Sequence, residues 1–257
     1  MSDTMETEEP SPAKQREVIR GTQDLDKLIK SKLEKATEEN PVRAAIFGHP
    51  YPDPDCISSQ MGMAWLLLRH YNIESDCFYQ GEISHPQNNA MNNLLEPNLR
   101  RASEDYKPED YALNILVDTI PDNAGTDGKK IKWDVVIDHH KTITLNGCKA
   151  LFIHAKTGSC AAIVYHLMEK IATDVWLDTD NELDGRVATG LISGIITDTE
   201  YMISDDSTEL EFDAFKSLFP FRSANNLRDI VFFKRPKSWI DMSALACSEA
   251  EIDGEGY

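Results

Sequence analysis

The chain has 257 residues, of which 41% are hydrophobic and 27% charged, so it can bury a core of its own in one large domain. Its 44 acidic and 26 basic residues give a net charge of −18, which disfavours tight binding to long nucleic acid, because such binding relies on Lys and Arg contacts to phosphate. Five widely spaced cysteines without a CxxC pair disfavour a disulfide framework and a structural zinc site.

The N-terminal residues are polar and acidic, and we expect a disordered acidic tail over residues 1–15 rather than a signal peptide. No apolar run approaches the roughly 20 residues needed to cross a membrane. The sequence therefore predicts a cytoplasmic protein without a membrane partner.

Helices and strands are predicted to alternate along most of the chain. The first helix covers about 24–40 and ends at Asn40-Pro41. Further helices are expected at 58–71, capped by Ser58 or Ser59, and at 86–96, 158–172 and 184–199. Strands are expected at 42–49, 74–79, 111–119, 133–140 and 149–154.

This alternation predicts an α/β fold with a doubly wound sheet of about five mainly parallel strands and helices on both faces. We expect this domain to occupy residues 16–205. Three short helices are predicted after it, forming a helical C-terminal extension over 206–250, and a frayed tail covers 251–257.

Histidine and aspartate follow the apolar runs of several predicted strands. The segment "GHPYPDPD" offers His49, Asp53 and Asp55 in a loop that three prolines stiffen. Ligands of parallel sheets bind beyond the carboxyl ends of the strands. Imidazole combined with several carboxylates suits Mn²⁺, Fe²⁺ or Zn²⁺ better than Ca²⁺. A Pro- and Asp-rich turn is the plain structural alternative for this loop.

Four further candidates share the same kind of position, and a fifth follows the apolar run of the helix predicted at 184–199; they are Asp118, Asp138, His139 and His140, and then Asp198. Taken alone, Asp118 is better explained as a turn residue or a helix cap than as a ligand. Two adjacent histidines at a strand end are rarely both structural, and a carboxylate within the apolar run "GIITDT" is costly to bury without a partner. Together these residues predict a metal site at one edge of the sheet.

Four motifs in order, "HPYPDPD", "LVDT", "VIDHH" and "GIITDT", resemble the DHH phosphoesterase superfamily over about residues 40–205. The segment "TGSCAAIVYHL" is similar to the Ser-containing helix start of that family. The resemblance implies a metal-dependent enzyme with two ions, usually Mn²⁺, with Mg²⁺, Co²⁺ or Fe²⁺ as alternatives. By analogy, one ion is held by His49, Asp53 and Asp118, and the other by Asp55, Asp118, His139 and Asp198.

In the same resemblance Asp118 bridges the two ions, His140 faces the substrate phosphate, and Asp138 orients the histidines. Asp118 and His140 are therefore the expected catalytic residues. Two dications can share one water, and the bridging hydroxide so formed attacks phosphorus in line. Ser159 is open to two interpretations: it binds a substrate anion at a helix N-terminus, or it is an ordinary N-cap.

The leading functional hypothesis is a phosphodiesterase that hydrolyses short oligonucleotides or small nucleotides. One alternative is an inorganic pyrophosphatase or polyphosphatase of DHH type, because "CISS" after Asp55 is similar to those relatives. The other is a non-catalytic DHH-fold binding protein. No glycine lies between Gly194 and Gly254, so the Gly-rich substrate loop of a second DHH domain is not expected. The helical tail, the acidic termini or a partner subunit, such as a second copy, would then complete the pocket.

Overall fold

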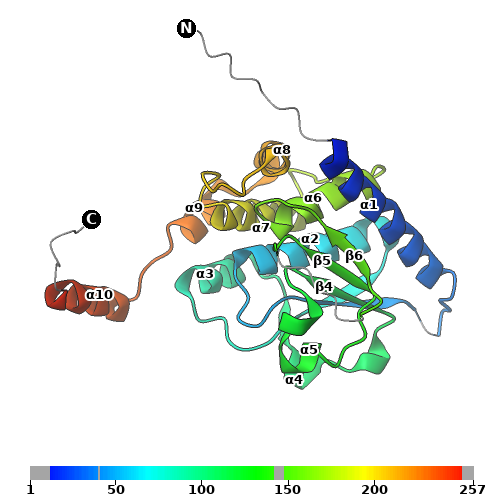
Figure 1. Ribbon diagram of the computed structural model, residues 1–257, viewed down its shortest axis with the longest axis horizontal. Helices are drawn as coiled ribbons and strands as arrows, with labels where there is room; N and C mark the ends of the chain where they lie inside the picture. Colours follow the sequence, from blue (N-terminus) through cyan, green and yellow to red (C-terminus); the bar gives the residue numbers. More distant parts are fainter. Residues whose placement is uncertain (1–11, 40, 142–147, 251–257) are drawn as a thin grey trace, which may run out of the picture.

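The centre of the protein is a six-stranded, fully parallel sheet (Figure 1). The computed structural model describes residues 12–39, 41–141 and 148–250. The strands are β1 (Arg43–Phe47), β2 (Glu74–Tyr79), β3 (Leu99–Arg101), β4 (Leu113–Val117), β5 (Val135–Asp138) and β6 (Leu151–His154). They lie in the order β3-β2-β1-β4-β5-β6. The expected fold class is confirmed, with one more strand than predicted.

The two faces of the sheet are covered differently. The longer helices lie on one face: α1 (Pro12–Leu33), α2 (Pro54–Tyr71), α3 (Pro86–Leu95), α6 (Cys160–Ile171) and α7 (Glu182–Asp198). The other face carries α4 (Ala102–Asp105), α5 (Gly125–Gly128) and the short 3-10 turns Pro108–Asp110 and Pro121–Asn123. Aromatic side chains fill this second core, where Phe47 stacks on Phe78 and meets Trp133 edge-on. The central strands are therefore apolar on both sides, as parallel strands usually are.

The start of α2 differs from the sequence expectation. The N-cap is Asp53, whose Oδ1 accepts a hydrogen bond from the backbone N–H of Cys56 at 2.9 Å, and Pro54 occupies the first helical position. Proline is favoured there because its missing N–H has no partner in the first turn. Ser58 and Ser59, predicted as caps, are instead buried within the helix.

Helices α2 and α7 cross closely beneath the sheet edge. A side chain at Gly194 of α7 would place its Cβ 2.2 Å from Ser58 Oγ and 3.0 Å from Asp55 Cα. The first turn of α2 can lie this near α7 only because residue 194 has no side chain. This crossing brings Asp55 toward the end of α7.

The expected first helix begins earlier and ends sooner than predicted, spanning Pro12–Leu33 rather than reaching Asn40. Its start lies inside the acidic tail expected over 1–15, and the rest of that tail, like the tail expected over 251–257, lies outside the described residues. Among the described helices, none is long and apolar enough to cross a membrane.

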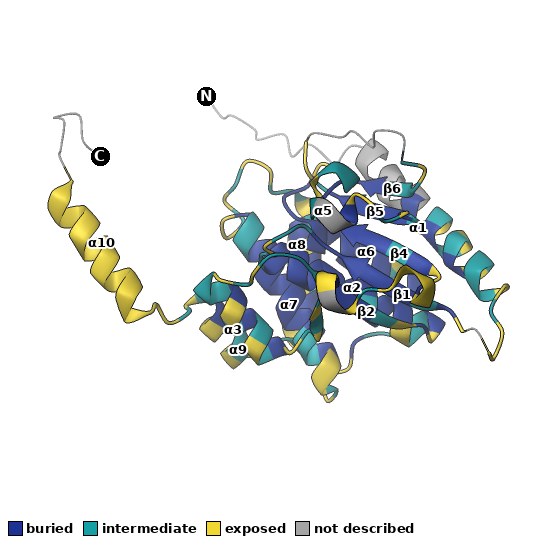
Figure 2. Ribbon diagram, turned by 90° about the horizontal axis from the view of Figure 1, so that it is seen from below, coloured by how far each residue is buried: buried dark blue, intermediate teal, exposed yellow. Residues whose placement is uncertain are grey.

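Three helices follow residue 205, as predicted. Helices α8 (Glu209–Leu218) and α9 (Ala224–Val231), with the 3-10 turn Phe219–Phe221 between them, lie against α6, α7 and α3. The last helix, α10 (Lys237–Glu249), is exposed along its whole length and extends away from the body beyond its first turn, where Trp239 lies near His85 (Figure 2).

Candidate metal centre

The predicted ligands meet where the order of the strands reverses. Strands β1 and β4 are neighbours, and the chain proceeds outward from them in opposite directions. Such a switch point leaves a crevice beyond the carboxyl ends of the two strands. His49 and Asp53 follow β1, and Asp118 follows β4 directly. The topology alone thus brings three of the predicted ligands together.

The first group of donors forms around His49. Its Nε2 lies 3.4 Å from Asp118 Oδ2 and 3.6 Å from Asp53 Oδ2. Its Nδ1 donates to the carbonyl of Pro50 at 2.9 Å, so Nε2 is the nitrogen that faces the carboxylates. Because Asp53 uses Oδ1 to cap α2, only its Oδ2 is directed at His49.

The second group of donors forms around His139. Its Nε2 lies 3.2 Å from Asp198 Oδ2, 3.4 Å from Asp118 Oδ1 and 3.8 Å from Asp55 Oδ2. Its Nδ1 donates to the carbonyl of Thr157 at 3.2 Å, which fixes the ring with Nε2 toward the acids. Asp118 therefore faces both imidazoles, one with each oxygen, as expected for a residue shared by two groups.

The donor set fits divalent cations. Asp118 Oδ1 and His139 Nε2 are buried and make no hydrogen bond of acceptable geometry within the described part of the chain. A cation between them would satisfy both atoms. The types of ligand also fit a divalent cation, since imidazole and carboxylate together suit Mn²⁺ and similar metals.

The pKa shifts of these groups also indicate a site for a cation. Burial opposes a charge on His139, but the carboxylates of Asp118 and Asp198 raise its pKa to about 12. Burial, and then the neighbouring Asp118 and Asp198, raise the pKa of Asp55 well above its usual value. The crowded acids thus require positive charge, which protonated imidazoles supply until a cation displaces their protons.

Asp55 is held more tightly than the other acids. It is fully buried, and its two oxygens accept hydrogen bonds from the first backbone amides of α6, Cys160 at 2.7 Å and Ala161 at 2.8 Å. The amides and the helix dipole carry partial positive charge, which offsets part of the repulsion that Asp55 meets from Asp118 and Asp198. The anion at this helix N-terminus is therefore a side chain of the protein itself.

Ser159 was predicted to touch substrate or to cap α6, and the structure shows a cap. Its hydroxyl accepts from the N–H of Ala162 at 3.3 Å, and the residue is fully buried behind Asp55. Because it does not line the cavity described below, a substrate contact of Ser159 has no support from its position.

Asp118 has an unusual backbone. Its φ of 58° lies in the left-handed region, which residues other than glycine, asparagine and aspartate rarely adopt. Its N–H donates to the carbonyl of Ile137 at 2.8 Å, tying it to the end of β5. Strained backbone of this kind is often found at functional sites, where the surrounding structure holds it in place.

His140 and Asp138 form a separate pair beside the cluster. His140 Nδ1 donates to Asp138 Oδ1 at 2.8 Å, while the imidazole side chain remains 58% exposed. The hydrogen bond with Asp138 raises the pKa of His140. In β6, His154 Nε2 donates to the carbonyl of His140 at 2.9 Å and so fixes the backbone of the pair.

A cavity of about 1310 Å³ opens over these residues. It is lined by the predicted His49, Asp53, Asp118, Asp138, His139, His140 and Asp198. Lys141 and Lys156 also line it, although Lys141 pairs with Asp206 at 2.9 Å. Arg186 of α7 forms ion pairs with Glu96, just after α3, and with Glu182 of α7. The cavity is strongly acidic, so an anionic substrate needs cations to enter it.

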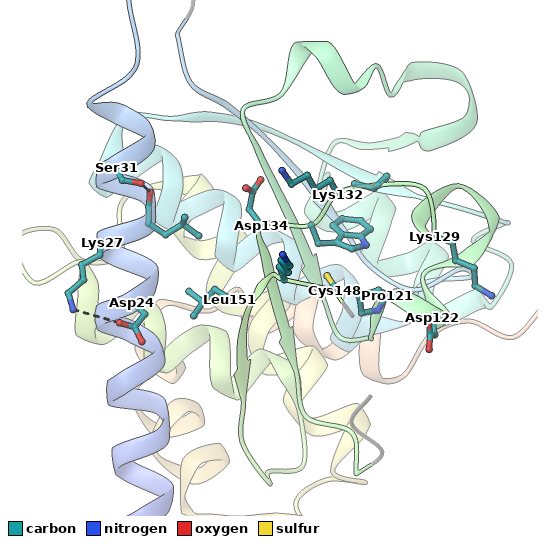
Figure 3. A pocket seen from close by; sticks show the side chains of 14 residues that line it. Asp24, Lys27, Ser31, Pro121, Asp122, Lys129, Lys132, Asp134, Cys148 and Leu151 are labelled. Carbon is teal, nitrogen blue, oxygen red and sulfur yellow. Dashed lines mark hydrogen bonds and ion pairs between the residues drawn. The ribbon is translucent and has the colours of Figure 1, made fainter. Parts of the chain in front are cut away.

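A second cavity of about 980 Å³ lies between α1 and residues 121–134 (Figure 3). Lys27, Lys129 and Lys132 stand around it with Cys148 and Asp134. Among the described residues that line it, none belongs to the predicted metal or substrate set.

Two supporting residues were not found from the sequence. Thr157 orients His139 through its carbonyl, and Glu211 in turn holds the Thr157 hydroxyl and the N–H of Gly158, the latter at 2.9 Å. Glu211 also accepts from the N–H of Thr208 at 2.7 Å, closing the capping box of α8. The pattern Thr208-x-x-Glu211 was visible as a capping box, but its contact with residues 157–158 depends on tertiary structure.

The fold and the site define an α/β protein with two adjoining groups of metal donors at the switch point of a parallel sheet. Residues 43–195 match the DHH family, N-terminal domain, and the chain belongs to this family. Three of the four motifs that resembled the superfamily lie inside the matched residues, and the fourth, which carries Asp198, begins at their end.

Two relatives by sequence are informative. An uncharacterized protein of Methanocaldococcus jannaschii is 31% identical over 204 residues, 77% of this chain and 39% of the relative. A probable manganese-dependent inorganic pyrophosphatase of Staphylococcus epidermidis is 32% identical over 178 residues, 67% of this chain and 53% of the relative. The chain thus spans about half the length of such relatives or less.

A solved structure is similar in fold. It is an exopolyphosphatase-related protein from Bacteroides fragilis, with a TM-score of 0.71 and 12% identity, covering 91% of this chain and 66% of that one. At this identity the likeness establishes the fold alone.

Proposed function

We propose that this chain carries the metal centre of a phosphoesterase that hydrolyses a small phosphorylated substrate. One observation carries the proposal: Asp118 lies between two imidazoles, 3.4 Å from each, with its Oδ1 and His139 Nε2 buried and unsatisfied. Without a bound cation this arrangement would destabilise the folded state, because buried carboxylates repel one another and unpaired polar atoms lose their solvation.

These residues would hold two cations, for which Mn²⁺ is the leading candidate. His49, Asp53 and Asp118 would bind one, and Asp55, Asp118, His139 and Asp198 the other. When bound, such cations lower the pKa of a water and offset the charge of phosphoryl oxygens.

The chain's own contribution is position and proton supply. Thr157 and Pro50 hold the two imidazoles with Nε2 toward the acids, so no reorganisation is needed when substrate arrives. Asp138 keeps His140 oriented and favours its protonated form. His140 is the exposed member of the site and lines the cavity. Its position suits it to donate a hydrogen bond to a phosphoryl oxygen or a proton to the leaving group.

Inorganic pyrophosphate is the substrate that the relatives favour, since several of them are described as manganese-dependent inorganic pyrophosphatases.

A short oligonucleotide or small nucleotide is favoured by a different observation. His85, at the start of α3, has Phe233 and Trp239 at ring distances of 5.2 and 5.3 Å. Trp239 is exposed and Phe233 partly exposed, and aromatic rings of this kind beside Lys234, Arg235 and Lys237 are ones on which bases stack.

The test is phosphate or nucleotide release by the full chain with Mn²⁺, offered pyrophosphate, a dinucleotide or long single-stranded DNA. We expect turnover of pyrophosphate or the dinucleotide and none of long DNA, because the acidic cavity repels an extended polyanion. Turnover of neither small substrate, with Mn²⁺ bound, would leave a binding protein of DHH fold and contradict the enzymatic proposal.

A further inference from the structure

Cys56 lies against the first group of metal donors. It follows Asp55 in the first turn of α2 and is fully buried. Its Sγ, one nitrogen of His49 and one oxygen of Asp118 all lie within 4.8 Å of one another. The five cysteines contain no CxxC pair, so their spacing alone does not mark Cys56 as a ligand.

Gly48 makes room for this sulfur. A Cβ at residue 48 would lie 1.9 Å from Cys56 Sγ, so any other residue there would displace the thiol. The sulfur therefore occupies the space beside the end of β1, next to the residue that carries the His49 imidazole. The backbone of Gly48 on one side and helix α2 on the other fix the position of the sulfur.

The distances suit a shared cation. Ligand atoms at roughly 2.0–2.3 Å from one ion lie roughly 3–4.5 Å apart. His49 Nε2 and Asp118 Oδ2, at 3.4 Å, fall in that range, and the sulfur lies within 4.8 Å of both residues' ligand atoms. The other oxygen of Asp118, Oδ1, faces His139 and is buried without a hydrogen-bond partner in the described part of the chain, so this carboxylate has one oxygen for each group of donors.

We propose that Cys56 Sγ is a further ligand of the ion held by His49 and Asp118, which gives this position a preference for soft or borderline dications such as Zn²⁺, Co²⁺ and Cd²⁺. The inference rests on the proposed metal centre and refines it. Sulfur favours such ions over Mn²⁺, whereas the group around His139 offers only imidazole and carboxylate. The two positions therefore differ in metal preference.

Cys160 provides a matched control. It is also a fully buried free thiol and follows Ser159 at the start of α6, near Asp55. Its Sγ donates to the carbonyl of Ile137 at 3.5 Å, so this sulfur is already engaged. The backbone N–H that Cys160 gives to Asp55 remains in an alanine variant.

The experiment adds Co²⁺ or Cd²⁺ to the full chain and records the ultraviolet charge-transfer absorption of a sulfur–metal bond. We expect the band in the natural protein and in Cys160→Ala, and its loss in Cys56→Ser and Cys56→Ala. Cys56→Ser is nearly isosteric, and circular dichroism of both variants verifies the fold. The Cd²⁺ affinity of Cys56→Ser should fall at least about tenfold relative to its Mn²⁺ affinity.

Retention of the band in Cys56→Ser, or Cd²⁺ bound without any band in the natural protein, overturns the role of Cys56. Either result leaves the proposed metal centre standing, because the ion is still bound. Failure of the natural protein to bind any of these ions, or Mn²⁺, overturns both proposals together.

Discussion

Mn²⁺ is expected to stabilise the folded chain against heat. Six side chains would share the ions: His49, Asp53, Asp55, Asp118, His139 and Asp198. In the folded state their positions are fixed by helix caps, strand ends and backbone hydrogen bonds, whereas the unfolded chain scatters them. A cation that binds only the folded state therefore raises the free energy of unfolding.

The size of the effect follows from mass action. One site at 100 times its dissociation constant contributes about 2.7 kcal/mol. For a domain of this size 1 kcal/mol corresponds to about 2–4 °C, so one occupied site raises the Tm by roughly 5–10 °C. Two occupied positions raise it further.

The assay is thermal unfolding with and without Mn²⁺, in the natural chain and in Asp118→Asn. Asparagine is the suitable replacement because it tolerates the positive φ of 58° at residue 118, which alanine does not. Asp206→Asn is the control, since Asp206 lines the same cavity but contacts Lys141 rather than the donors. We expect the shift to vanish in Asp118→Asn and to persist in Asp206→Asn; equal shifts in all three proteins would refute the reasoning.

Three further substitutions test the α2–α7 crossing, the buried contacts of Asp184 and the Asp138–His140 pair. Gly194→Ala would push Ser58 and the backbone of Asp55 away from α7, so chemical denaturation should show a loss of about 1–3 kcal/mol and Mn²⁺ affinity should fall; an unchanged affinity would show that the site does not depend on this helix crossing. Asp184→Ala would leave the N–H of Trp65, now 2.7 Å from Asp184 Oδ1, and the partly buried Arg69 without their acceptor, at a cost of about 3–5 kcal/mol in unfolding experiments. Asp138→Asn should lower kcat about 10–100-fold through His140 while the Mn²⁺-induced rise in Tm stays intact, and loss of that rise would instead make Asp138 part of the metal binding.

Much of the fold could be predicted because local and tertiary preferences agree. The run Glu74–Tyr79 forms a strand with the predicted bounds, and the three C-terminal helices lie where their apolar spacing indicated. Strand β3 was missed because Leu99–Arg101 contains one apolar residue and is a strand only through its pairing with β2. Such an edge strand leaves almost no pattern in its own sequence.

The site, like the fold, could be predicted from the sequence only in part. Strand ends could be located, so the meeting of His49 with Asp118 was predictable from the parallel topology. Asp198 ends helix α7, and its approach to His139 depends on how that helix packs. The role of Ser159 was not, because the sequence could not show that Asp55 occupies the N-terminus of α6. Contacts between segments about a hundred residues apart follow from helix packing, which no local motif records.

Phosphate release from pyrophosphate or a dinucleotide with Mn²⁺, compared between the natural chain and Asp118→Asn, tests the central claim most directly. Asp118 faces both imidazoles, so its loss should remove the shared donor of both metal positions. We predict Mn²⁺-dependent release that falls at least about 100-fold in the variant, with the fold intact by circular dichroism. Equal release by the two proteins would contradict the assignment of this cluster as the catalytic metal centre.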